Sequence, residues 1–165
     1  MPGRKNKPLH VKIVTVVILV SVFFLPVDGK IVSSSLSSVW YTHFISQFFH
    51  VNIFHLLANL YVLVIMRFSL SELFAAYLLS IPATWVSPDG CAGFSSVLYA
   101  LMGILIQRIR MGRTEWALFI ASNAATAFIP NIAFVVHLSS FSLGWVYARL
   151  KGLFHEYGRA CKRKQ

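Results

Sequence analysis

Long apolar runs separated by short polar breaks dominate this chain. Unbroken hydrophobicity of this length, without the alternation of a half-buried strand, is typical of membrane helices. Several runs are shorter than the ~20 residues usually needed to cross a bilayer, so tilt or local thinning of the membrane is expected. The pattern predicts spans at about residues 13–27, 51–68, 70–86, 94–109, 115–129 and 132–150.

The segments around these runs define one membrane domain with two basic ends. Residues 1–12 form a basic N-terminus, residues 13–150 the six-helix domain, and residues 151–165 a basic tail. The first run resembles a secretory signal, but no Ala-x-Ala-like site follows Pro26-Val27-Asp28, so we interpret it as the first span. The loop 28–49 turns from Ser-rich to aromatic and suits a segment at the membrane surface. No internal repeat or second domain is evident.

Composition supports an integral, multi-pass membrane protein. The chain has 165 residues, of which 57% are hydrophobic and 12% charged, too apolar for a soluble domain. Its net charge of +10 does not predict nucleic-acid binding, because the Lys and Arg residues cluster at segment ends. Cys91 and Cys161 fall on opposite sides of the predicted bilayer, which excludes a disulfide between them within one chain.

Charge also gives the orientation. With the N-terminus inside, only Lys30 of the fifteen Lys and Arg residues lies outside, a strong positive-inside signal. We therefore expect an all-α polytopic membrane protein, a six-helix bundle with both termini in the cytoplasm.

Three of the predicted spans carry polar residues where lipid-exposed groups would be costly. His55 and Asn59 lie in the second span, Ser95 and Tyr99 in the fourth, and His137 in the sixth. Ionisable residues inside a membrane are expensive and usually functional. His55 lies twelve residues before Arg67, Ser95 thirteen before Arg108, and His137 twelve before Arg149. At the helical rise all three lie ~18–20 Å above the inner boundary, about 10 Å below the outer surface.

Spacing within the spans predicts how these residues meet. His55 and Asn59, and likewise Ser95 and Tyr99, are four positions apart and share a helix face. Small residues also recur on the fourth and sixth spans, which allows close helix approach and would bring His137 near Ser95. These ridges are Ser96, Ala100 and Gly103, and Ser140, Gly144 and Ala148.

The residue types point to acyl-transfer chemistry. A serine needs a base to become a nucleophile, and an imidazole is the usual one, so Ser95 and His137 fit as nucleophile and general base. The five carboxylates lie in loops or near span ends, which favours a dyad, with Tyr99 packed against the imidazole. His55, Asn59 and the backbone N–H of Ser95 are candidate donors to an oxyanion.

Other interpretations remain at this point. Ser96 would be the nucleophile if the helix were turned by ~100°. His55 and His137 could hold zinc, but a third strong ligand is lacking, so no metal or cofactor is expected. Cys91 lies near the nucleophile without an evident base.

The constellation resembles the rhomboid family of intramembrane serine proteases. His50, His55 and Asn59 match its second-helix motif; Gly93, Ser95 and Tyr99 match its fourth-helix motif; His137 and Gly144 match its sixth-helix motif. The resemblance implies Ser95 as nucleophile, His137 as base, His55 and Asn59 as oxyanion donors, and His50, Tyr99, Gly93 and Gly144 as supporting residues. Ser96 and Ser140 stand where the family has glycine, and Trp40-Tyr41 replaces a Trp-Arg pair.

The implied function is that of an intramembrane endopeptidase. Its substrates and partners would be membrane-spanning proteins cut near the outer face, in the plasma (inner) membrane, with no nucleic acid involved. An inactive relative that binds transmembrane helices is the alternative, and a small channel or transporter is a further one. The sequence does not give the oligomeric state.

Overall fold

The protein is all-α, as predicted. The computed structural model describes residues 7–27, 33–87, 90–108, 112–126 and 133–162, and within them the one extended pairing is an isolated bridge between Ser34 and Cys91. The longer helices are α1 (Lys7–Phe23), α4 (Ile53–Ile65), α5 (Leu70–Thr84), α6 (Ser95–Leu105), α7 (Arg113–Thr126) and α8 (Phe134–Lys162). Short helical segments are α3 (Thr42–Ile45) and the 3-10 turns η1 (Ser46–Phe48) and η2 (Ile106–Arg108).

Each predicted span corresponds to one long helix, but the ends differ. α8 continues to Lys162, whereas the predicted span ends at residue 150, because polarity ends an apolar segment without breaking a helix. α1 begins at Lys7, in the basic N-terminal segment. Some predicted positions lie outside the described residues, namely Lys30 and the span boundaries at residues 109, 129 and 132. Residues 1–6 and 163–165 also lie outside them.

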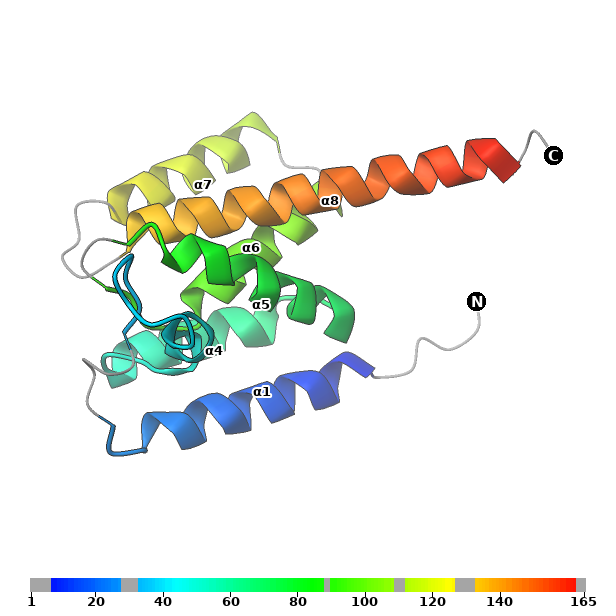
Figure 1. Cartoon of the computed structure of the whole chain (residues 1–165). Helices are drawn as coiled ribbons and strands as arrows, with labels where there is room; N and C mark the ends of the chain where they lie inside the picture. The colour runs from blue at the N-terminus through cyan, green and yellow to red at the C-terminus, as the bar shows by residue number, and fades with distance from the viewer. Residues whose placement is uncertain (1–6, 28–32, 88–89, 109–111, 127–132, 163–165) are drawn as a thin grey trace.

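The helices are arranged around α6 and α8 (Figure 1). α5 packs on both of these helices, while α1 lies beside α4 and α7 beside α8. The start of α1 and the end of α8 lie on the same side of the bundle, and the second half of α8 projects beyond the other helices (Figure 1).

Many large apolar side chains lie on the outer surface of this bundle, in addition to those in its apolar core. On α4, Leu56 is 2% exposed but Phe54 is 80% exposed, and large apolar side chains are also exposed on α1, α5 and α8. Apolar surface on this scale is unusual for a soluble monomer and is expected for helices that face lipid. The core is formed chiefly by α6, whose Val97, Ala100 and Leu101 are fully buried.

Apart from α8, the described helices are short for membrane-crossing segments. Within the described ranges, no helix taken singly combines the length and hydropathy expected of a membrane-crossing segment. By these two criteria Thr42–Phe48 and Ile53–Ile65 pass together, as a pair bent by 87°.

α6 and α8 approach so closely that their backbones touch at glycines. A Cβ on Gly144 would overlap the carbonyl oxygen of Ala100, and a Cβ on Gly103 would overlap that of Phe141. Ser140 is fully buried one turn before Gly144. The predicted small ridges therefore do form the crossing, and replacing the family glycine by Ser140 has not prevented backbone contact.

Candidate active site

A glycine turn sets the start of α6 and with it the position of Ser95. Gly93 has φ +134°, a conformation that favours glycine, and Ser95 is the first residue of α6. The N–H groups at a helix start have no partner within the helix. The backbone N–H of Ser95 is therefore at a position where it can donate to an incoming group.

Ser95 and His137 meet across the α6–α8 crossing. The Ser95 Oγ lies 2.9 Å from the Nε2 of His137, within hydrogen-bond distance, although the two residues are 42 positions apart. An imidazole nitrogen at this distance can accept the hydroxyl proton if the ring carries its own proton on Nδ1. The His137 Nδ1 is buried and makes no hydrogen bond to a described group.

Tyr99 fixes the plane of the His137 ring. The two rings stack with centroids 4.3 Å apart and an angle of 10° between their planes. Tyr99 lies one turn after Ser95 on α6, so a single helix presents both the hydroxyl and the stacking surface. Stacking resists tilting of the imidazole out of this plane, which restricts the orientations in which Nε2 can meet Ser95.

α4 brings two further donors to the site. The side chain of Asn52 caps α4 by accepting a hydrogen bond from the backbone N–H of His55, at 2.9 Å. The His55 ring lies against Gly93, where a Cβ would be only 2.5 Å from Cε1. Asn59, one turn on, is 5% exposed, and its Nδ2 donates to no described group. A buried amide donor without a partner is unusual, because such groups are normally hydrogen-bonded.

His50 supports the turn before Ser95. The backbone N–H of Phe94 approaches the His50 Nε2 at 3.5 Å, the outer limit of a hydrogen bond. The His50 and His55 rings pack edge to face at 5.2 Å. His50 thus contacts both the α6 turn and the α4 histidine and lies outside the Ser95–His137 pair.

Ser96 and Ser140, which stand where the resembled motifs have glycine, make no described hydrogen bond to Ser95 or His137. The Ser96 Oγ lies 3.4 Å from the carbonyl oxygen of Gly93, and the residue is 4% exposed. The Ser140 Oγ is buried and bonds to no described group. The rotated interpretation, with Ser96 as nucleophile, has no described imidazole contact to support it.

Sequence reasoning missed a buried polar network that fixes residues 34–48. The His43 Nδ1 bonds the Thr84 hydroxyl at 2.7 Å, and the Ser80 hydroxyl donates to the Gln47 side chain at 2.5 Å. His43, in the loop 28–49 that the sequence predicts to lie at the membrane surface, is 1% exposed. The spacing of Tyr77, Ser80 and Thr84, which places three polar groups along one face of α5, is a signal that could have revealed this contact.

A second part of this network reaches the active-site turn. The backbones of Ser34 and Cys91 pair through two hydrogen bonds of 2.8 and 2.9 Å, and the Gly93 N–H donates to the Ser46 carbonyl at 3.0 Å. Burial raises the pKa of the Cys91 thiol, outweighing hydrogen bonds from Ser34 and Ser87 that lower it. A protonated thiol is a poor nucleophile, which argues against Cys91 as a reactive group.

The described residues contain no group of three His, Cys, Asp or Glu side chains that could hold a metal ion. The groups that this arrangement brings together are a hydroxyl, an imidazole stacked on a tyrosine, and N–H donors. These are the elements of acyl transfer through a covalent intermediate.

Comparison with known proteins identifies the family. The model of the Rhomboid domain matches residues 37–153, which is most of the chain and includes every candidate site residue but excludes α1. The curated proteins contain no match. The resemblance inferred from the three motifs is confirmed, and this protein belongs to the rhomboid family of membrane proteins.

Proposed function

We propose that this protein is an intramembrane serine endopeptidase that cuts membrane-spanning substrates near the outer face of the plasma (inner) membrane. The observation that carries the proposal is the 2.9 Å distance between the Ser95 Oγ and the His137 Nε2. Stacking of Tyr99 on the imidazole and the unpaired Asn59 amide add to it.

The reaction follows from these groups. His137 Nε2 accepts the Ser95 proton as Oγ bonds to the carbonyl carbon of the substrate, and the carbonyl oxygen becomes an oxyanion. Asn59 Nδ2, the His55 ring and the Ser95 backbone N–H donate to that oxyanion. The protonated His137 then gives its proton to the leaving amine as the C–N bond breaks. Water, deprotonated by His137, attacks the acyl-enzyme and releases the second product and the Ser95 hydroxyl.

The proposed oxyanion donors are the Asn59 amide, the His55 ring and the Ser95 backbone N–H. Removing a single such donor typically costs about 10²–10³ in kcat. The Asn59 Nδ2 is buried and donates to no described group. The site therefore holds this donor ready for a charge that develops only during the reaction.

The proposal is tested by covalent labelling. The purified protein, reconstituted in lipid, is treated with a serine-hydrolase phosphonate and compared with Ser95→Ala, His137→Ala and Ser96→Ala. We expect the label on Ser95, its loss with Ser95→Ala, and a rate at least about 10²-fold lower with His137→Ala. Ser96→Ala is the matched control, one position along α6, and should label like the wild type.

Two results would contradict the proposal. Absence of labelling in a wild-type protein shown to be folded by circular dichroism would favour an inactive rhomboid-like binder of transmembrane helices. Labelling that survives Ser95→Ala but not Ser96→Ala would move the nucleophile to Ser96.

A further inference from the structure

A cavity of about 650 Å³ lies at the end of the bundle away from Ser95. It is bordered by the end of α6 with η2, the start of α5 and the second half of α8. Arg108 is thirteen residues after Ser95, so the cavity lies ~20 Å along the helix axis from the nucleophile. It has no part in the proposed peptide-bond chemistry.

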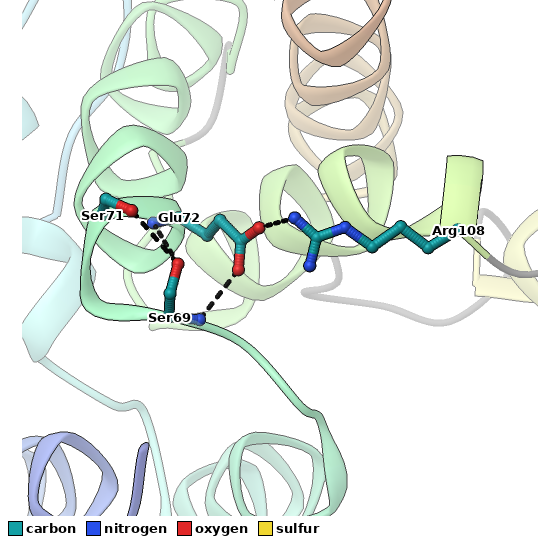
Figure 2. Close-up of polar contacts among 4 residues, drawn as sticks. All are labelled: Ser69, Ser71, Glu72 and Arg108. Carbon is teal, nitrogen blue, oxygen red and sulfur yellow. Dashed lines mark hydrogen bonds and ion pairs between the residues drawn. The ribbon is translucent and has the colours of Figure 1, made fainter. Parts of the chain in front are cut away.

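The charges around this cavity are unequal. Glu72 lines it but is already paired: one carboxylate oxygen contacts the Arg108 guanidinium, and the other accepts the Ser69 backbone N–H at 2.8 Å (Figure 2). The Arg108 side chain remains 61% exposed, so one edge of its guanidinium still faces solvent. Lys151 also lines the cavity, and its Nζ lies 5.8 Å from the centroid of the Tyr147 ring. Two cations therefore face one carboxylate that is fully engaged.

Apart from Gln107, whose side-chain amide donates to the Trp145 carbonyl at 2.8 Å, the remaining wall of the cavity is apolar. Ile104, Ala148, the Tyr147 ring and Phe154, which is 75% exposed, supply this part of its lining. On the adjoining surface of α8, Leu150 and Leu153 are 50% and 62% exposed. A cationic rim beside an apolar wall is complementary to an amphiphile with an anionic head, and the volume is in the range of small-ligand sites.

The predicted orientation of the bundle in the membrane indicates which anionic amphiphile the cavity would meet. By the positive-inside distribution of Lys and Arg, this end of the bundle faces the cytoplasm, where anionic phospholipids are concentrated. Basic pockets between membrane helices on that side bind such headgroups. We propose that the cavity binds the headgroup of an anionic phospholipid, with its phosphate between Arg108 and Lys151 and its acyl chains against the apolar wall.

The test is a lipid titration of the full chain. Delipidated protein in a neutral detergent receives phosphatidylglycerol or phosphatidylcholine at equal mole ratio, and thermal unfolding is followed by tryptophan fluorescence. We expect phosphatidylglycerol at saturation to raise the midpoint ~5 °C more than phosphatidylcholine does. Inorganic phosphate at the same concentration should give no such rise.

Matched variants locate the effect. Lys151→Gln should remove most of the difference between the two lipids, whereas Arg149→Gln should keep it. Arg149 carries the same charge on the same helix, but it lies over the Trp145 ring at 5.3 Å and does not line this cavity. Arg108 is left intact, because its replacement would break the pair with Glu72. Ser95→Ala should respond to phosphatidylglycerol like the wild type, which separates this proposal from the proposed protease activity.

Several outcomes would overturn the lipid proposal. Equal shifts of the unfolding midpoint with both lipids would mean that the cavity does not discriminate between anionic and zwitterionic headgroups. Equal losses in Lys151→Gln and Arg149→Gln would mean attraction to net charge without a site. A full shift with inorganic phosphate would assign the cavity to a free anion.

Discussion

At the scale of single residues, the site depends on contacts that leave no room for adjustment. Ser95 and His137 meet at 2.9 Å, and the turn before Ser95 presses Gly93 onto the His55 ring. Because His55 is held from the other side by the cap of α4, the glycine couples the nucleophile to a proposed oxyanion donor. Position 93 therefore tolerates a side chain poorly, although Gly93 is not part of the Ser95–His137 pair.

We expect Gly93→Ala to damage the site without touching its reactive groups. The new Cβ would lie 2.5 Å from the His55 Cε1, and a φ of +134° is unfavourable for alanine. The strain should lower stability by about 1–3 kcal/mol, and displacement of His55 should slow phosphonate labelling at least about tenfold. Thermal unfolding and labelling rate are the measurements.

Gly152→Ala is the control for this change. A Cβ there has no neighbour within 4 Å, so the substitution should keep the labelling rate and stabilise the helix by about 0.5–1 kcal/mol. A Gly93→Ala protein that labels at the wild-type rate would show that His55 is not held by this glycine.

The residues of the dyad could be predicted from the sequence because each stands out against an apolar helix. Ser95 and His137 are polar, share a depth and lie on ridges of small residues, so the sequence alone predicts their contact. His43 and Gln47 could not be found from their own segment, because their partners Thr84 and Ser80 are 41 and 33 positions away and the only sequence signal is the polar face of α5. Loop residues have no periodicity that would reveal a buried face.

At the scale of elements, one helix crossing determines whether the dyad forms. α6 carries Ser95 and Tyr99, α8 carries His137, and the backbones touch at Gly103 and Gly144. The sequence predicts this crossing from its small residues, although it does not predict the length of α8. The apolar run that predicts the span ends near Leu150, but α8 continues to Lys162.

Gly144→Ala should separate the two helices. The added methyl would overlap the Ala100 carbonyl, a backbone group that cannot rotate away, at a cost of about 1–3 kcal/mol. A wider crossing lengthens the Ser95–His137 distance, so labelling by the phosphonate should fall more than stability alone explains. Ser142→Ala, an exposed position on the same helix, should change neither quantity.

Ser140→Gly, which makes a residue at the α6–α8 crossing smaller, tests the same crossing in the opposite direction. Ser140→Gly removes buried atoms that make no hydrogen bond to a described group, so labelling should be kept or increased. A large loss of labelling would instead show that the Ser140 hydroxyl acts in the site through a contact absent from this conformation.

At the scale of the whole molecule, the two ends of the bundle differ in kind. Toward one end lie the dyad and the polar network of residues 34–48. At the other lies the projecting part of α8 (Figure 1), and the Glu72–Arg108 pair joins the start of α5 to η2, which follows α6 (Figure 2). The family match covers residues 37–153, so α1, which packs on α4 and contains the fully buried Leu19, lies outside the matched residues.

Orientation in the membrane is the prediction that joins these two ends to function. In a background with Cys91→Ser and Cys161→Ser, single cysteines are placed at Ser37, exposed beside the active-site turn, or at Gly152, in open space on α8. A membrane-impermeant maleimide should label Ser37→Cys on intact cells and Gly152→Cys only after permeabilisation, because the Lys and Arg distribution keeps α8's end inside. The reverse pattern would place the Ser95–His137 pair toward the cytoplasm. Cleavage at the outer face would then be excluded even if Ser95 reacts, since a substrate bond and the hydrolytic water must both reach the dyad from the side on which it opens.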